Sequence, residues 1–179
     1  MNNPIKIFEE EREERILSYS GNNALREAAD GFNLQSNLTQ YSYNFSWMGR
    51  PIIQYPQDMI AMQEIIWQLK PDLVIETGIA HGGSLIYYAS LLELIGNGLV
   101  LGIDIDIRDH NRKEIEKHPM YKRVQMITGS SIDAGTVEKI REIAKGKSKV
   151  LVCLDSNHTH EHVLQELELY SEFVSVESY

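Results

Sequence analysis

Residues 73–84 read L-V-I-E-T-G-I-A-H-G-G-S, an apolar run that ends in an acid and opens into a glycine-rich turn. Leu73, Val74 and Ile75 have the apolar, largely β-branched character of a strand buried on both faces, as in a parallel sheet covered by helices. The glycines that follow allow backbone conformations and close approaches that a Cβ atom would block. A helix beginning near Ser84 would point free N–H groups into this turn. The stretch therefore predicts a ligand site at the end of a central strand.

The spacing of these glycines differs from the dinucleotide fingerprint G-x-G-x-x-G, because it reads E-T-G-x-x-x-G-G-S. An acid at the end of the strand disfavours a pyrophosphate by like-charge repulsion, but it suits a ligand with an amino or sulfonium group. S-adenosylmethionine carries both groups. For this motif taken alone, the alternative that the glycines only make a tight strand-to-helix turn stays open.

The rest of the chain alternates apolar runs with segments of helical period. Strands are predicted over three further runs, residues 99–103, 124–128 and 150–154. Helices are predicted over residues 58–69 with Asp58 as N-cap, from Ser84 to Gly96, over 109–118, around Val137, Ile140 and Ile143, and over 159–170 with Val163, Leu167 and Tyr170 on one face. Strands that alternate with helices predict an α/β fold with a parallel sheet and right-handed crossovers.

Each predicted strand ends in polar residues, namely Glu76, Asp104, Gly129-Ser130 and Asp155. In open α/β sheets, ligands bind at the carboxyl ends of the strands. Asp104 follows the glycine turn by about one βαβ unit, the distance at which an acid accepts hydrogen bonds from ribose hydroxyls. Each residue alone could be a helix cap, but the four together predict a cofactor crevice.

The N-terminal third has a different composition. Residues 7–19 alternate charges around a few apolar side chains, which predicts a solvated helix. Residues 21–57 are rich in Asn, Ser, Gln and aromatic residues without a clear period, so we expect a long loop that acts as a lid over the ligand or as a strap packed on the core. The predicted division is therefore residues 1–57 and residues 58–179.

Charge and cysteine content restrict the partners and the compartment. The net charge of -9 argues against a general nucleic-acid binder and against an anionic membrane surface. The N-terminus is too acidic for a transit peptide and lacks the apolar core of a signal peptide, and no run is long enough to span a membrane. Cys153 is the single cysteine, so a disulfide within the chain is impossible. We expect a cytoplasmic protein.

Other chemistries fit these residues less well. His158 and His162 have the spacing to share a helical face, but no third ligand has the spacing of a structural zinc site. Ser130 or Ser131 would need a general base in reach to act as a nucleophile, and neither lies in a G-x-S-x-G elbow. Cys153, in mid-strand, is expected to be inert packing.

Four segments together resemble the cephalosporin hydroxylase and rhamnosyl O-methyltransferase family: K-P-D-L-V-I-E-T-G-I-A-H-G-G-S, G-I-D-I-D-I-R-D-H-N-R, I-T-G-S-S and V-L-V-C-L-D-S-N-H-T-H-E-H-V. The upstream W-M-G-R-P-I-I-Q-Y-P-Q-D-M also resembles this family, so the likeness covers roughly residues 45–179. The resemblance implies a class I, S-adenosylmethionine-dependent methyltransferase fold. It implies that the methionine part of the cofactor is lined by Glu76, Gly78, His81, Gly82, Gly83 and Ser84. It also places Asp104 at the ribose, Ser130 and Ser131 near the adenine, and Asp155 as a divalent-metal ligand with His158 close by.

The activity that this resemblance implies is O-methylation of a hydroxyl on a sugar or an antibiotic-like or polyketide-like small molecule. Asp155 and His158 would be the catalytic residues, with Mg²⁺ at Asp155 lowering the pKa of the acceptor hydroxyl. The alternatives are a non-catalytic ligand-binding or assembly module and, less favoured by the glycine spacing, a nicotinamide-dependent oxidoreductase. In the family, the tyrosine that matches Tyr179 leads into a fifth strand with further metal ligands. We therefore expect a C-terminally incomplete sheet with an apolar edge at residues 150–154, weak metal binding, a homo-oligomer and little methyl transfer.

Overall fold

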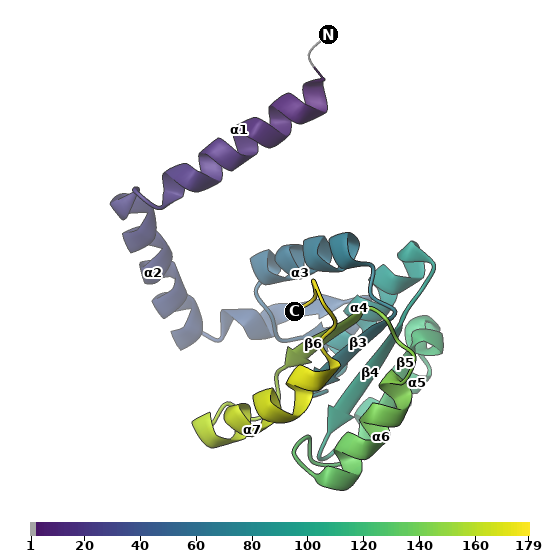
Figure 1. The fold of residues 1–179 in the computed structure, drawn as a ribbon. Coiled ribbons are helices and arrows are strands. Elements are labelled where there is room, and N and C mark those ends of the chain that lie inside the picture. Colours follow the sequence, from purple (N-terminus) through teal and green to yellow (C-terminus); the bar gives the residue numbers. More distant parts are fainter. Residues whose placement is uncertain (1–2) are drawn as a thin grey trace. The chain divides into compact units, whose positions relative to one another are not determined.

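The computed structural model describes residues 3–179, which divide into two compact units between Ser42 and Tyr43. The first unit holds α1 (Pro4–Tyr19) and α2 (Asn23–Leu38). The second unit holds the other elements (Figure 1): β1 (Phe45–Trp47), β2 (Arg50–Ile52), α3 (Pro56–Leu69), β3 (Leu73–Thr77), α4 (Gly83–Ile95), β4 (Leu99–Asp104), α5 (Asp109–Glu116), β5 (Val124–Thr128), α6 (Ala134–Ala144), β6 (Val150–Leu154) and α7 (His160–Tyr170). Short 3₁₀ helices cover Tyr41–Asn44, Pro119–Arg123 and Ser171–Phe173.

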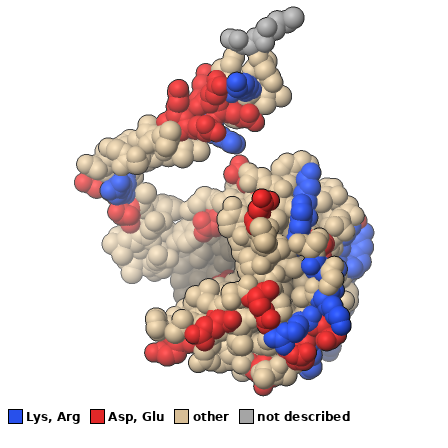
Figure 2. Space-filling view, viewed as in Figure 1, with Lys and Arg blue, Asp and Glu red and all other residues tan. Residues whose placement is uncertain are grey.

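The two helices of the first unit each begin at an asparagine. The Asn3 side chain accepts a hydrogen bond from the Ile5 N–H, and the Asn22 side chain accepts one from the Leu25 N–H. The predicted solvated helix is confirmed, since α1 has no buried residue, and its acidic side chains form a red band in Figure 2. The prediction of a loop after residue 21 was wrong for α2. There, the N-cap Asn22 and the run A-L-R-E-A-A at residues 24–29, all good helix formers, outweigh the scattered polar residues.

The second unit is built on a four-stranded parallel sheet with the strand order β5-β4-β3-β6. The central strand β3 pairs on one side with β4, with Leu73 opposite Leu99, and on the other side with β6, with Leu73 opposite Val150. The predicted strands at residues 124–128 and 150–154 are confirmed residue for residue. This arrangement confirms the predicted α/β fold.

Helices cover both faces of this sheet. Successive side chains of a strand point to opposite faces, so each apolar strand contributes to a core on either side of the sheet. Val74 belongs to the apolar core under α3 and α4, whereas Leu73 and Ile75 belong to the core under α6 and α7. All five residues of β3 are buried, as expected for a central parallel strand. The carboxyl end of β3 therefore lies between the carboxyl ends of β4 and β6.

Residues 43–57 include the β1–β2 hairpin, which packs on α4. The Trp47 indole N–H donates to the Ser90 hydroxyl at 3.0 Å, and the Trp47 ring meets Tyr87 edge to face at 4.9 Å between centroids. The compact units therefore divide after residue 42 instead of after residue 57. We expected this segment to be either a lid over the ligand or a strap packed on the core, and the hairpin packs on the core.

Two helix predictions need correction in detail. Helix α3 begins at Pro56 and its N-cap is Tyr55, so Asp58 lies in the first turn and does not cap it. Proline at the first helical position fixes the start, because it needs no N–H partner there. On α7, Leu167 is 54% exposed, and the buried positions are Glu166 and Tyr170. The inner face of α7 is therefore partly polar.

Strand β6 lies at the edge of the sheet, as expected, but its outer backbone has partners. The Val152 N–H donates to the Tyr179 carbonyl at 3.0 Å, and the Val150 N–H donates to the Ser175 hydroxyl at 3.0 Å. Of the apolar side chains that follow α7, Phe173 is buried but Val176 is 92% exposed. Backbone and hydroxyl oxygens thus accept hydrogen bonds from the outer side of β6.

Candidate functional site

The glycine-rich turn joins β3 to α4 and depends on backbone conformations with positive φ. Gly78 has a φ of +89°, and a Cβ atom there would lie 2.0 Å from the Asp155 carbonyl oxygen. Gly83 is confined in a similar way, since its Cβ would lie 2.1 Å from the Pro51 carbonyl oxygen. These two glycines let the end of β6 and the β2 strand pass directly against the turn.

Asp104, at the end of β4, holds this turn. Its Oδ2 accepts hydrogen bonds from the backbone N–H of Ile79 at 2.8 Å and of Ala80 at 3.3 Å. Its Oδ1 accepts from the Asp106 N–H at 3.0 Å. A carboxylate has about four acceptor positions, so Asp104 can still accept from a ligand hydroxyl.

Arg50 and Asn111 hold the turn from the other side. The Arg50 guanidinium donates twice to the His81 carbonyl, at 3.0 and 2.5 Å, and once to the Asn111 Oδ1 at 3.1 Å. Asn111, only 4% exposed, donates from Nδ2 to the Ala80 carbonyl at 2.9 Å. Ala80 has a φ of +45°, a region that alanine rarely adopts, so this clamp keeps a strained segment in place. Sequence reasoning missed both residues.

Glu76 lies beneath the turn and is only 1% exposed. The Ser84 hydroxyl donates to its Oε2 at 2.7 Å. The pKa of Glu76 is raised to about 8, chiefly by burial and also by the nearby Asp155 charge, whereas the hydrogen bonds with Ser84 and Tyr88 lower it. The carboxyl group is therefore largely protonated at neutral pH in the free chain. A ligand cation placed beside it would favour the ionised form.

A first cavity of about 260 Å³ opens over the turn. Among the residues predicted from the sequence, it is lined by Gly78, His81, Gly83, Ser84, Asp104, Asp155 and His158. Gln54 also lines it, and the side-chain oxygen of Gln54 is buried without a hydrogen-bond partner among the described residues. An unpaired buried acceptor at a cavity wall is a position where a ligand donor would be stabilised.

Gly82 lines neither this cavity nor the second one described below. It is the N-cap of α4 with a φ of +78°, and a Cβ atom there would lie 2.3 Å from the Ile115 side chain. Its position thus serves the packing of α4 on α5. Its predicted role in cofactor binding stays a prediction.

Asp155 follows β6 and faces the first cavity with His158. The Asp155 N–H donates to the Thr77 carbonyl at 3.0 Å and to the Thr77 hydroxyl at 3.2 Å, which fixes the start of the loop. The carboxylate lies 3.6 Å from the His158 Nε2. Burial raises the pKa of Asp155, His158 lowers it and the Glu166 charge raises it. His158 precedes the start of α7 at His160, so it does not share a helical face with His162, contrary to the sequence prediction.

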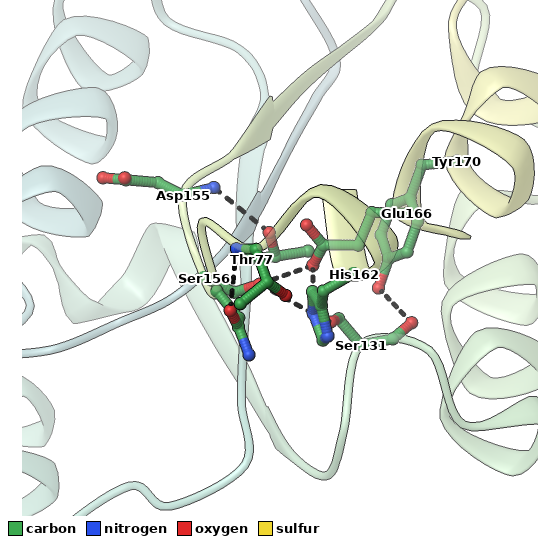
Figure 3. Close-up of polar contacts among 9 residues, drawn as sticks. Thr77, Ser131, Asp155, Ser156, His162, Glu166 and Tyr170 are labelled. Carbon is green, nitrogen blue, oxygen red and sulfur yellow. Dashed lines mark hydrogen bonds and ion pairs between the residues drawn. The ribbon is translucent and has the colours of Figure 1, made fainter. Parts of the chain in front are cut away.

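A second cavity of about 190 Å³ shares Asp104 with the first and includes Ser130, Ser131, Ser156 and His162 in its wall. The His162 Nε2 lies 3.1 Å from the Ser131 hydroxyl oxygen, and the Tyr170 hydroxyl donates to the Ser131 carbonyl at 3.0 Å (Figure 3). The two predicted serines are thus brought together with Asp104. From the sequence, we considered His162 only as a metal ligand. Its spacing of four residues from Glu166 was the feature of the sequence that could have indicated this contact.

Ser131 does have a histidine in reach, but the geometry does not fit nucleophilic catalysis. Glu166 Oε1 approaches the same nitrogen, Nε2, at 3.4 Å, whereas a catalytic triad needs the acid on the opposite ring nitrogen. Ser131 is also 5% exposed. This network therefore shapes a binding wall.

Glycine turn, strand-end acids and two adjoining cavities define a class I, S-adenosylmethionine-dependent methyltransferase fold. Solved structures agree at the level of the fold: a structure of CmcI described with Mg and SAM has a TM-score of 0.54 at 19% identity, covering 70% of this chain and 51% of that one. A putative caffeoyl-CoA O-methyltransferase from Staphylococcus aureus has a TM-score of 0.55 at 13% identity, covering 92% and 68%.

Residues 39–179 match the Rhamnosyl O-methyltransferase/CmcI family, and the chain belongs to this family. The rhamnosyl O-methyltransferase of Mycobacterium bovis (strain BCG / Pasteur 1173P2) is 32% identical over 139 residues, covering 75% of this chain and 54% of that protein. The chain thus spans about half the length of the curated relatives it matches. The family predicted from the four motifs is confirmed.

Two further findings concern metals and membranes. Within residues 3–179, no three His, Cys, Asp or Glu side chains gather in a way that could hold a metal ion. In the same part of the chain, no helix combines the length and the apolar content needed to span a bilayer.

Proposed function

We propose that this chain binds S-adenosylmethionine and forms the cofactor-binding part of an O-methyltransferase. One observation carries the proposal: the Asp104 carboxylate holds the glycine turn and lines both the first and the second cavity. A ligand that occupies both cavities must pass this carboxylate, which suits ribose hydroxyls. The methionine part would lie in the first cavity and the adenine in the second.

The charges around the first cavity favour a cationic ligand over a pyrophosphate. Glu76 lies beneath the turn, and Asp104 and Asp155 lie at its rim. A pyrophosphate would meet the Asp104 and Asp155 carboxylates, whereas an ammonium or sulfonium group would be attracted to them and would favour the ionised form of Glu76. Ser84, Gly78, His81, Gly82 and Gly83 complete the proposed methionine site, with Gln54 offering an unpaired acceptor.

The proposed reaction is an in-line transfer. The acceptor hydroxyl oxygen attacks the methyl carbon, the sulfur leaves with the electron pair of the broken bond, and the hydroxyl proton passes to a base. Asp155 and His158 are the proposed catalytic groups, because they line the same cavity as Ser84. Their 3.6 Å separation lets Asp155 stabilise a His158 imidazole that has taken up the proton.

A divalent ion does not fit the described residues well. Asp155 is a single carboxylate, and Mg²⁺ sites usually combine one or two carboxylates with waters and substrate oxygens. We therefore expect Mg²⁺ to bind this chain weakly, with a dissociation constant on the order of millimolar. Calorimetric titration with MgCl₂ measures it, and a tight stoichiometric site would contradict this expectation.

The proposed acceptor is a small molecule with a sugar-like or antibiotic-like hydroxyl, since the curated relatives carry the name rhamnosyl O-methyltransferase. We further propose a homo-oligomer that works in the cytoplasm. Light scattering tests the first point, and a stable monomer would contradict it.

Calorimetry with S-adenosylhomocysteine and with NAD tests the function. We expect S-adenosylhomocysteine to bind at micromolar concentration and NAD not to bind. Methyl transfer to candidate sugars would then separate an enzyme from a non-catalytic binding module. NAD binding in place of S-adenosylhomocysteine would refute the proposed function.

A further inference from the structure

His162 is the one imidazole in the wall of the second cavity, among the described residues. Its side chain is 16% exposed and contacts Ser131, in the loop after β5, and Ser156, in the loop after β6. The same cavity includes Asp104, the proposed ribose ligand, together with Ile103 and Ile105, which offer apolar surface to a planar base. His162 therefore lies where the base of a bound nucleoside would be read.

Three oxygen atoms surround the Nε2 atom of His162 (Figure 3). They belong to the Ser131 hydroxyl at 3.1 Å, the Ser156 hydroxyl at 3.1 Å and the Glu166 carboxylate at 3.4 Å. The Nδ1 atom has no hydrogen-bond partner within residues 3–179. The two ring nitrogens are thus in different environments.

These contacts select one tautomer of the ring. The Ser156 hydroxyl donates its hydrogen to the Glu166 Oε1 at 2.7 Å, so its oxygen can only accept from His162. A carboxylate such as Glu166 also only accepts. In the neutral form of the ring, Nε2 therefore carries the proton and Nδ1 has a lone pair.

We propose that His162 Nδ1 accepts a hydrogen bond from the exocyclic amino group of the cofactor's adenine, so that His162 determines the specificity for this base. The inference rests on the proposed function, because it requires S-adenosylmethionine or its product to occupy both cavities. Glu166 acts as a positioning residue, since its carboxylate, which is 1% exposed, keeps the proton on the opposite nitrogen.

The proposal explains how the chain distinguishes purines. Adenine presents a donor at C6, which matches the lone pair of Nδ1. A 6-oxo purine presents an acceptor there, and a purine with hydrogen at C6 presents no polar group. A site built to pair with a donor rejects a ligand that lacks it, because its own polar atom is then left unpaired.

The test compares S-adenosylhomocysteine with its analogue that carries hydrogen in place of the 6-amino group. For the unmodified chain, calorimetry should show about tenfold weaker binding of the analogue, as expected for one lost hydrogen bond in a buried site. This arm requires no substitution, so it does not depend on a variant that folds.

Two variants locate the effect on one ring nitrogen. His162→Asn keeps an acceptor near the position of Nδ1, so a several-fold preference for the amino ligand should remain. His162→Gln keeps a polar group near the position of Nε2, facing Ser131, Ser156 and Glu166, and should bind both ligands alike. Thermal denaturation shows whether each variant is folded.

The outcomes distinguish failure of the proposed role of His162 from failure of the proposed cofactor binding. If the unmodified chain binds both ligands equally, or if His162→Gln keeps the full tenfold preference, the role of His162 is refuted while cofactor binding stands. If S-adenosylhomocysteine does not bind the unmodified chain at all, the proposed function fails, and the inference fails with it.

Discussion

Substitution of Gly78 by alanine tests whether the end of β6 must pass directly over the glycine turn. With a φ of +89°, an alanine pays a conformational cost of about 1–2 kcal/mol for the left-handed region. Its Cβ would also lie 2.0 Å from the Asp155 carbonyl oxygen and 2.7 Å from the Asp155 carbonyl carbon, so the backbone must move. Overpacking of this kind costs about 1–3 kcal/mol. The expected loss in the free energy of unfolding is therefore about 2–5 kcal/mol.

Gly96→Ala is the matched control. Gly96 has a φ of +85°, and among the described residues no heavy atom lies within 4 Å of the position of its Cβ. This variant should lose only the conformational term, about 1–2 kcal/mol. Urea denaturation of both variants measures the two losses on one scale. Equal losses would refute the steric argument, because the Asp155 backbone would then place no extra restriction on Gly78.

Three further predictions concern the surroundings of the turn. Asp104→Ala should weaken S-adenosylhomocysteine binding tenfold or more, since charged hydrogen bonds contribute about 1.5–3 kcal/mol, and calorimetry that shows unchanged affinity in a folded variant would contradict the ribose role. Because the pKa of Glu76 is about 8 in the folded chain and ordinary in the unfolded chain, folding takes up a proton, and Glu76 makes the free energy of unfolding fall as pH rises from about 5 to about 8. In Glu76→Gln this contribution disappears. Urea denaturation should therefore show the free energy of unfolding of the variant rising relative to that of the parent by up to about 1.4 kcal/mol per pH unit. If the two free energies change with pH in the same way, burial does not hold the proton on Glu76. Arg50→Ala should lower the free energy of unfolding by about 2–3 kcal/mol by removing its bonds to His81 and leaving a buried amide oxygen unpaired, and Arg50→Lys should restore little, because a lysine cannot form the same fork. Full recovery with lysine in the same denaturation assay would argue against the clamp.

The sheet could be predicted from the sequence because its strands are short apolar runs bounded by polar residues. Residues 150–154 carry this signal without interruption, and the strand has those limits. Helix α2 was missed because Asn, Ser and Gln are interspersed along it, although Leu25, Ala28, Ala29 and Phe32 recur at helical spacing and its asparagine cap was readable. The inner face of α7 was misjudged, because Leu167 has the right spacing for burial but Glu166 takes that place through its hydrogen bond to Ser156.

The functional site also has features that the sequence predicts and features that it does not. The glycine turn and Asp104 follow from local patterns, since a strand end and a turn are short-range features. Arg50 and Asn111 lie 61 residues apart in the chain and meet only after the sheet and α5 have formed. Local patterns in a single sequence do not predict a contact between residues so far apart in the chain. The role of His162 depends on which of its ring nitrogens faces Glu166, which spacing alone does not decide.

The strand order β5-β4-β3-β6 has a consequence for synthesis on the ribosome. Strands β3, β4 and β5 leave the ribosome first and can pair in sequence, but β6 joins β3 only after residues 150–154 have been made. Until then β3, whose five residues are all buried in the folded chain, is an open edge, with Leu73, Val74 and Ile75 ready to pair with another chain. The nascent chain is therefore most prone to aggregation between completion of β5 and completion of β6, and a pause in translation within α6 would prolong that interval.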